Sequence, residues 1–387
     1  MKKKVTVTYK TVITAVIAAV MLTFAITYYF ITLVYYKKYK NYSLLAEAHA
    51  YVDKYYYGDE VEESSLTEST LGGYISGLND VYSCYNGIQK TQERTDNYAG
   101  LKAGIGITVS EADDGYLLVD EVSEDSTAQQ AGISAGDIII SIDGKDTKEL
   151  GMSGAVQLIS EGKIDSQIVL KIKRDNEVSD YSVKIGKIDI VSVYGKLVEK
   201  NIGYIYITKF NEKTSEQFIE LLNSLKNEGA EGYIFDVRDN GGGLVSAVEK
   251  CLDPLLPEGE IAVAIYKDGK SQTIVQSDAT ETDMPMTVLM NENSASGAEL
   301  FAASLHDFKD VDLVGKKSFG KGIMQNLFTL SDGSTITLTV ARYKTTRSEC
   351  YHGIGLKPDY EVEYDNDQES DKQFDKAVEV LRQKLIK

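Results

Sequence analysis

The chain has 387 residues, which is enough for two or three domains and at least one large hydrophobic core. Its formal net charge is -18 at pH 7. A nucleic-acid surface needs a clustered basic face, and the sequence after residue 40 has none, so DNA and RNA binding are excluded. The 3 cysteines are widely spaced and odd in number, which fits neither a disulfide framework nor a zinc or C-x-x-C redox pattern.

An uncharged apolar segment over residues 11–36 exceeds the roughly 20 residues that a helix needs to cross a bilayer. It predicts a membrane span, with residues 1–10 as a cytoplasmic N-terminus. A cleaved signal peptide is the alternative, but its apolar part runs roughly 7 to 15 residues and ends in small residues. Here Tyr35, Tyr36 and Lys37 come last, which favours a retained anchor.

The next two segments differ in their hydrophobic period. Residues 37–97 carry apolar side chains at helical spacing, as in "YSLLAEAHAYVDKYYY" and "LTESTLGGYISGLNDVYSCY", and predict a helical arm. Residues 98–189 contain short β-branched runs such as "GYLLVDEV" and "SQIVLKIKR", separated by Gly, Asp and Asn turns. They predict a small β-rich domain.

Residues 190–387 predict an α/β core. The order "IGYIYITKF", "TSEQFIELLNSLKNEG", "GYIFDVRDNGGG" indicates a βαβ unit with a glycine loop at the carboxyl end of a strand, where ligands collect in open α/β sheets. "NLFTLSDGSTITLTVARY" predicts a hairpin around an Asp-Gly turn, and "DKQFDKAVEVLRQKLI" an amphipathic C-terminal helix. The expected fold class is therefore α+β and multidomain: a transmembrane helix, a helical arm, a β-rich domain and an α/β core.

Ser296 lies where an expected strand passes into an expected helix, within "NSASGAELF". At the first turn of that helix, the dipole and the free N–H groups would stabilise an oxyanion that develops at the serine. The alternative is structural, because Ser296 followed by Glu299 is also the capping-box pattern of an ordinary helix start.

A nucleophilic serine needs a base, and the 3 histidines offer few candidates. His49 lies in the arm, and His306 lies about 15 Å from Ser296 along the same helix. His352 stays open, although the sequence shows no Asp that would orient it.

Lys321 is the other candidate base, since it lies between two glycines in "SFGKGIMQ". A lysine acts as a base only if burial lowers its pKa from about 10.4 towards 7. A solvated turn residue is the alternative interpretation. Gln325, four residues further on, would orient a neutral amine if both side chains point inward.

Two further patterns concern ligands. The run "DNGGG" lacks the spacing of nucleotide-binding loops, but its N–H groups are suited to an oxyanion. A calcium-like stretch begins at Asp365, yet Ser370 stands where Gly is needed and Lys376 where Glu is needed. We expect no metal and no cofactor.

Several motifs together resemble the carboxy-terminal processing, or tail-specific, serine proteases, and they occur in that family's order. The likeness covers nearly everything after the apolar segment. It implies a PDZ domain over residues 98–189 and a peptidase core with a Ser-Lys catalytic centre over residues 190–387. The motifs are "GLNDVYSCY", "GIGITV", "AGISAGDIIISIDGK", "FDVRDNGGGLVSAV", "NENSASGAEL", "GKKSFGKGIMQ" and "GIGLKPD".

By this resemblance Ser296 is similar to the family nucleophile, Lys321 to its general base and Gln325 to the glutamine that steadies that lysine. Val81 stands where the family has the proline of its Asp-Pro-Tyr-Ser stretch, and Gly241 where it often has another proline. Neither departure removes a reacting group.

The resemblance implies an oxyanion hole made by the N–H of Gly297 together with that of Gly242 or Gly243. The sequence leaves the choice between those two open. Gly297 replaces the usual alanine, and Ala298 replaces the last serine of the family's run.

The PDZ-like domain suggests how a substrate is held. The N–H groups of Gly104, Ile105, Gly106 and Ile107 would form a nest for a terminal carboxylate, and the substrate tail would add as a strand. An apolar groove would select apolar C-terminal tails. An ordinary tight turn is the alternative for these four residues.

The expected function is that of a single-pass membrane endopeptidase that cleaves protein substrates near their C-termini. The resemblance implies an extracytoplasmic catalytic part, a bacterial source and a homodimer formed through the arm. A catalytically silent PDZ scaffold that docks protein C-termini at the membrane is the alternative.

Overall fold

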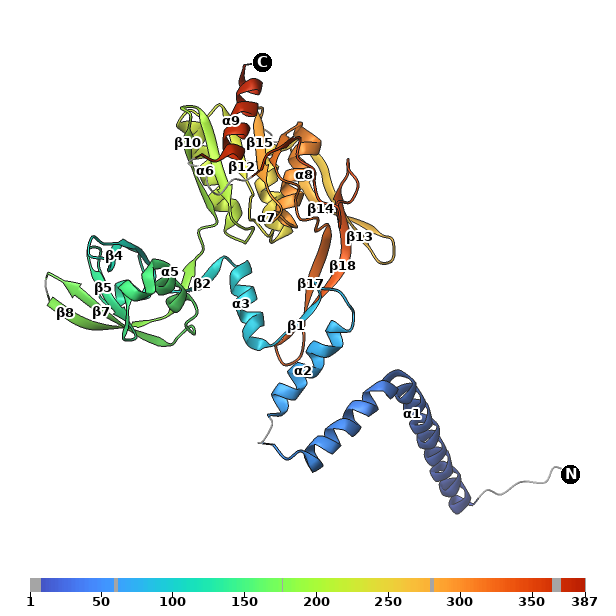
Figure 1. The fold of residues 1–387 in the computed structure, drawn as a ribbon. Helices are drawn as coiled ribbons and strands as arrows, with labels where there is room; N and C mark the ends of the chain where they lie inside the picture. The colour runs from blue at the N-terminus through green and yellow to red at the C-terminus, as the bar shows by residue number, and fades with distance from the viewer. Residues whose placement is uncertain (1–7, 59–61, 176, 279–281, 364–369, 387) are drawn as a thin grey trace. The chain divides into compact units, whose positions relative to one another are not determined.

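The computed structural model describes residues 8–58, 62–175, 177–278, 282–363 and 370–386 (Figure 1). The chain divides into two compact units, Met1–Thr67 and Glu68–Lys387. The second unit carries both the β-rich domain and the α/β core.

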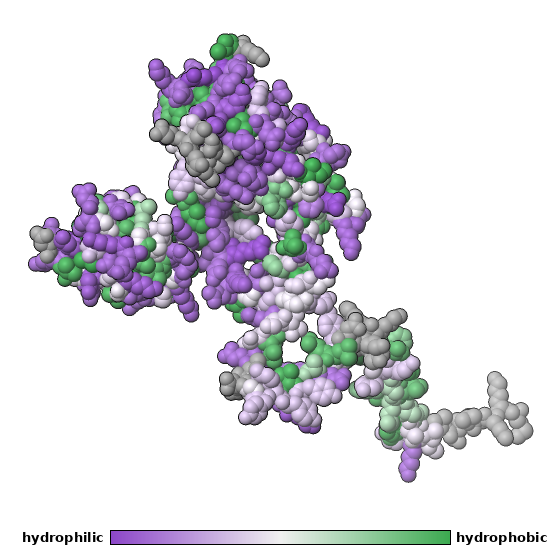
Figure 2. All heavy atoms as spheres, viewed as in Figure 1, coloured by the Kyte–Doolittle hydropathy of each residue, from purple (hydrophilic) through white to green (hydrophobic). Residues whose placement is uncertain are grey.

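The first unit is dominated by helix α1 (Tyr9–Tyr55), which continues past the expected end of the span at residue 36 without a break. Its segment Tyr9–Val34 has a mean hydropathy of 2.1 and is long and apolar enough to cross a bilayer. A signal sequence near an N-terminus meets the same criterion. Figure 2 shows hydrophobic residues along the exposed sides of this helix. Residues 1–7 of the expected cytoplasmic segment lie outside the described residues.

The helical pattern expected through residue 97 is interrupted. Helices α2 (Glu63–Ser76) and α3 (Ile88–Tyr98) are present, but strand β1 (Cys84–Asn86) separates them. This strand pairs antiparallel with β18 (Thr335–Thr345). The expectation of helix was wrong here because so short an apolar run does not distinguish helix from strand, and a partner far along the chain decides.

The β-rich domain has its own hydrophobic core, formed by residues such as Ile105, Ile139 and Leu170. Its helices are α4 (Thr127–Gln130) and α5 (Thr147–Ser160). A short pair of strands, β2 (Leu101–Gly104) and β9 (Gly186–Asp189), closes it. The main sheet has the order β3 (Ile107–Glu111), β4 (Leu117–Val122), β5 (Ile138–Ile142), β7 (Gln167–Arg174) and β8 (Glu177–Lys184), with β6 (Lys145–Asp146) on β5.

The α/β core is built on a six-stranded sheet in which all neighbours except the first pair are parallel. Helix α6 (Thr214–Asn227) connects two adjacent parallel strands, which confirms the predicted βαβ unit. The strand order is β10 (Val193–Val198), β11 (Ile202–Ile207), β12 (Gly232–Asp236), β15 (Met286–Met290), β16 (Asp312–Gly315) and β19 (Tyr360–Glu361).

Both faces of this sheet are covered, so β12 and β15 are buried along their whole length. One face packs against α6, α7 (Val245–Leu252) and α8 (Gly297–Lys309). The other packs against α9 (Lys372–Leu385), the predicted amphipathic C-terminal helix.

A second, antiparallel sheet completes the core. Its strands are β13 (Gly259–Tyr266), β14 (Ser271–Ser277), β17 (Ile323–Thr329), β18 and β1. A short 3-10 helix, Asp253–Leu255, precedes β13 in the chain. Strands β17 and β18 form the predicted hairpin. The loops after β12 and β15 and the segment before β17 carry the candidate catalytic residues.

Candidate active site

Ser296 stands at the start of α8 with φ 55° and ψ -115°. A positive φ is unfavourable for a residue other than glycine and costs on the order of 1–3 kcal/mol, and such strain concentrates at functional sites. Ser294 is different: it is buried, and its hydroxyl donates to the carbonyl of Val237 at 2.7 Å and accepts from the N–H of Asn291 at 2.9 Å. Ser294 therefore holds the loop, while the half-buried Ser296 faces the site.

Glu299 does more than the capping-box pattern predicts. Its carboxylate is 1% exposed and accepts the N–H of Ser296 at 2.9 Å. It also accepts the N–H groups of Gly320 and Lys321, each at 2.7 Å, and the hydroxyl of Ser318. A single buried carboxylate thus joins the start of the serine helix to the segment that carries the lysine.

Lys321 is half-buried. Burial lowers the pKa of its amine, and the positive charge of Arg94 acts in the same direction, while Asp80 and Glu299 oppose them. Its Nζ lies 4.9 Å from the centroid of the Tyr82 ring. Burial and the charge of Arg94 therefore favour the neutral amine more than a solvated turn would.

Tyr343 links the two candidate catalytic residues. Its hydroxyl donates to the backbone carbonyl of Lys321 at 2.8 Å. Burial raises the pKa of Tyr343, and the neighbouring hydroxyls of Tyr351 and Ser296 act against that shift. Ser296 and Lys321 therefore share a neighbour on strand β18.

Gln325 is not brought to Lys321. Its Nε2 lies 3.4 Å from the carbonyl of Ile323 and 3.4 Å from Oγ1 of Thr339, and among the described residues no hydrogen bond joins it to the lysine. A β-bulge between Met324 and Gln325 breaks the alternation of β17, which the sequence does not reveal.

The glycine loop after β12 lies against the start of α8. The N–H of Gly242 donates to Oδ1 of Asn240 at 2.8 Å, so it is already used. A Cβ built on Gly297 would lie 3.2 Å from the backbone nitrogen of Gly243. Among the hydrogen bonds of the described residues, the N–H groups of Gly243 and Gly297 have no acceptor. Two free donors therefore lie beside Ser296.

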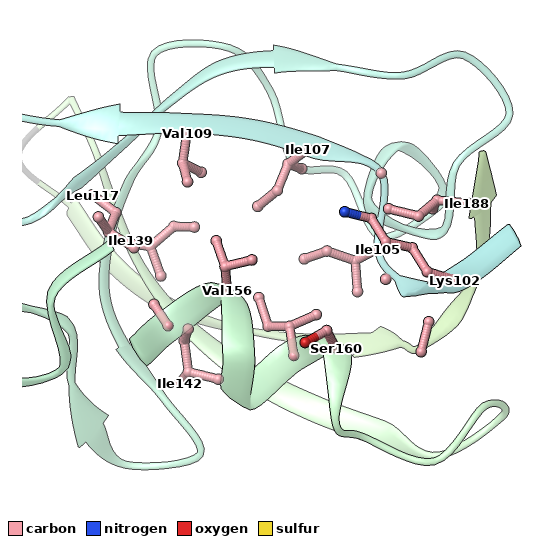
Figure 3. Close-up of a pocket in the computed structure, with 15 residues that line it drawn as sticks. Lys102, Ile105, Ile107, Val109, Leu117, Ile139, Ile142, Val156, Ser160 and Ile188 are labelled. Atoms are coloured by element: carbon pink, nitrogen blue, oxygen red, sulfur yellow. The ribbon is translucent and has the colours of Figure 1, made fainter. Parts of the chain in front are cut away.

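The β-rich domain has an apolar groove between β3 and α5, with Ile107 and Val109 on one side and Val156 on the other (Figure 3). At one end of this groove Gly104 closes β2 and Ile107 opens β3. The intervening N–H groups, those of Ile105 and Gly106, have no acceptor within the described part of the chain. The groove can hold an apolar chain, and its end can accept an anion.

Among the described residues, no hydrogen bond joins a histidine ring to Ser296. The ring of His306 bonds the carbonyl of Val311 at 3.0 Å. The ring of His352 lies edge-on to Tyr82, with 6.4 Å between centroids, and its Nδ1 is buried without a partner in the described ranges. Those ranges also hold no group of three or more His, Cys, Asp or Glu side chains arranged for a metal ion.

Sequence reasoning assigned no role at the site to Tyr82 or Arg94. Tyr82 lies within the motif "GLNDVYSCY", which is a signal that could have identified it. Arg94 carries no comparable signal. Both come from the segment before the β-rich domain, and the fold brings them to Lys321.

Comparisons with known proteins agree with this architecture. The family models that match are peptidase family S41 over residues 201–362 and the PDZ domain over residues 103–185. The chain is 33% identical over 321 residues to the carboxy-terminal processing protease CtpA of Bacillus subtilis (strain 168), covering 82% of this chain and 68% of the relative. It is 31% identical over 308 residues to CtpB of the same strain, covering 78% of this chain and 64% of that protein.

Among solved structures, the photosystem II D1 C-terminal processing protease matches at a TM-score of 0.49 with 24% identity, over 80% of this chain and 85% of that one. The fold and the matches define a serine protease that carries a PDZ domain. The chain belongs to peptidase family S41, the carboxy-terminal processing proteases. The chain spans 68% of the length of the Bacillus subtilis CtpA and 60% of the length of a probable CtpA-like serine protease of Staphylococcus haemolyticus (strain JCSC1435).

Proposed function

We propose that this chain is a membrane-anchored endopeptidase that cleaves proteins near their C-termini through an acyl-enzyme formed on Ser296. The observation that carries the proposal is that the Glu299 carboxylate accepts hydrogen bonds from the N–H groups of both Ser296 and Lys321. They fix a strained serine and a half-buried lysine on adjoining loops. A silent scaffold has no need for that arrangement.

The chemistry follows from these positions. The neutral amine of Lys321 takes the proton from Oγ of Ser296 as that oxygen bonds to the scissile carbonyl carbon. The N–H groups of Gly243 and Gly297 donate to the resulting oxyanion. The protonated amine then gives its proton to the departing nitrogen as the C–N bond breaks. Water, deprotonated in turn by Lys321, bonds to the carbonyl carbon of the ester. The bond from that carbon to Oγ then breaks, and the protonated amine returns the proton to Oγ of Ser296.

Gly243 is preferred to Gly242 as the second oxyanion donor because the N–H of Gly242 already bonds Asn240. Gln325 would steady the lysine only after its amide leaves Ile323 and Thr339. We therefore assign it a role in the substrate complex rather than in the resting enzyme.

The substrate tail is expected to add as a strand in the groove of the PDZ domain, which we place at residues 98–189. The free N–H groups of Ile105 and Gly106 would hold the terminal carboxylate, and the apolar lining would select apolar C-termini. The segment Tyr9–Val34 would anchor the chain, with the peptidase core, residues 190–387, outside the cytoplasm. Dimerisation through the arm, residues 37–97, belongs to the same proposal.

The test is cleavage of a protein with an apolar C-terminal tail by the full chain in detergent, beside Ser296→Ala, Lys321→Ala and His352→Ala. The three variants are matched by thermal unfolding. We expect the first two to lose cleavage by at least about a thousandfold and the third to retain it. Tail binding without cleavage by the unmutated chain, or loss of cleavage only in His352→Ala, would reject the Ser-Lys assignment.

A further inference from the structure

A rigid turn before strand β1 reaches the candidate base. Within it, Oδ1 of Asp80 accepts the N–H of Tyr82 at 3.0 Å, and Oδ2 accepts the hydroxyl of Ser83 at 2.6 Å. The Ser83 hydroxyl in turn accepts the N–H of Thr339 from β18 at 3.1 Å. Because β1 also pairs with β18, the turn is fixed to the sheet that holds the active site.

The ring of Tyr82 projects from this turn to the amine of Lys321. The 4.9 Å between Nζ and the ring centroid lies within the range of a cation–π interaction, which attracts the ammonium and not the neutral amine. The ring also lies edge-on to His352, with 6.4 Å between the ring centroids. No hydrogen bond in the described ranges joins Nζ of Lys321 to Ser296. In the resting enzyme the amine therefore contacts the Tyr82 ring rather than the serine hydroxyl.

We propose that Tyr82 is a positioning residue for the general base: its ring face holds the Lys321 ammonium in the resting enzyme and releases the amine to Ser296 once the proton has left. The inference rests on the proposed function, since it gives Lys321 the role of base. It adds a cation–π interaction that acts on the base only while the base is protonated. Tyr82, which supplies the ring, lies more than two hundred positions earlier in the chain.

Other charged and titratable groups also face Lys321, and their signs are mixed. The cationic guanidinium of Arg94 comes from α3 and the carboxylate of Glu299 from α8. Asp80 comes from the same turn as Tyr82. Burial raises the pKa of Asp80, but hydrogen bonds from Ser83, Thr339 and Tyr82 together outweigh burial and lower it. On the backbone of the segment that carries Lys321, the hydroxyl of Tyr343 donates to the carbonyl of Lys321 at 2.8 Å, and the thiol of Cys350 lies 3.5 Å from the carbonyl of Gly322.

The direction of the effect follows from the charge state. The ring stabilises the protonated amine, so removing it makes Lys321 lose its proton at lower pH. The acid limb of kcat/KM, on which Lys321 becomes neutral, should then move to lower pH in Tyr82→Leu, by roughly half a pH unit for a partly exposed contact. Tyr82→Phe keeps the ring face and should keep the limb in place.

The experiment records the pH profile of the full chain in detergent for the unmutated protein, Tyr82→Leu, Tyr82→Phe and the matched control Tyr85→Leu in β1. If Tyr82→Leu does not fold, pentafluorophenylalanine at position 82 gives the same shape with a reversed ring quadrupole and should move the limb in the same direction. A limb that stays in place while the plateau falls would show that Tyr82 only supports the fold, and would overturn the proposal.

A second readout separates this inference from the proposed function. Competitive acetylation of Lys321 in the Ser296→Ala background, followed by peptide mass spectrometry, reports the titration of the amine without any proteolysis. If Tyr82→Leu moves the titration of the Lys321 amine to lower pH, the cation–π interaction is supported even if the protein cleaves nothing. An unchanged titration rejects it even if the protease is active.

Discussion

Two glycine loops in this molecule present free backbone N–H groups, and they differ in what surrounds them. In the PDZ domain, Gly106 has φ 78° and ends an apolar groove. In the peptidase core, Gly243 has φ 147° and packs against the carbonyl of Phe210 beside a strained serine. Under the proposed function, similar free N–H groups would bind a stable carboxylate in the PDZ domain and a transient oxyanion in the peptidase core.

The difference lies in the neighbouring side chains. The PDZ loop is flanked by aliphatic residues such as Ile105 and Ile188, which favour an extended apolar ligand. The peptidase loop lies against Ser296, whose helix shares the Glu299 carboxylate with Lys321. The proposed function therefore assigns binding to one loop and catalysis to the other on the basis of the side chains around each loop, and this assignment can be tested.

Among variants that keep both Ser296 and Lys321, the largest effect is expected from Gly243→Ala. A Cβ at this position would lie 1.9 Å from the carbonyl oxygen of Phe210, so the loop must move and the oxyanion donor moves with it. We expect kcat to fall by about 100- to 1000-fold, the loss that accompanies removal of one such donor. Gly241→Ala is the control, because nothing lies within 4 Å of its Cβ position. Equal loss in both variants would remove the oxyanion role from Gly243.

A smaller effect, on binding alone, is expected from Gly106→Ala. Its Cβ would lie 2.4 Å from that of Ser126, and this clash distorts the end of the groove. The KM for a substrate with an apolar tail should rise about tenfold, while kcat on a short tail-free peptide should stay the same. Gly132→Ala, also at a positive φ but with open space around it, is the control. A fall in kcat on both substrates would contradict the separation of the two loops.

The smallest effect is a change in pH dependence, expected from Arg94→Gln. Burial lowers the pKa of Lys321 and the charge of Arg94 lowers it further, so removing that charge raises the pKa. The base works as the neutral amine, and the acid limb of kcat/KM should therefore move to higher pH, opposite to Tyr82→Leu. Profiles at low ionic strength give the clearest comparison. A limb that does not move would show that Arg94 does not act on the base.

Much of the fold was predictable from the sequence because its strands and helices carry strong local patterns. The βαβ unit, the hairpin and the C-terminal helix are present as predicted. Strand β1 was not predictable, since its three residues gain their structure only by pairing with β18. Local pattern cannot identify a partner that lies far away in the chain.

At the site, the sequence directed attention to Ser296 and Lys321 but not to what holds them. Glu299 was visible only as a helix cap, whereas its bonds to the lysine segment depend on tertiary structure. We prefer Gly243 to Gly242 as the second oxyanion donor because the N–H of Gly242 donates to the Asn240 side chain. Such assignments require atomic contacts, which motifs do not contain.

The central claim, that Ser296 reacts through Lys321, is tested most directly by a serine-reactive fluorophosphonate probe followed by peptide mapping. The account predicts a single adduct on Ser296 that forms far more slowly in Lys321→Ala and at the unmutated rate in His352→Ala. An adduct on another residue, or undiminished labelling of Ser296 in Lys321→Ala, would contradict it.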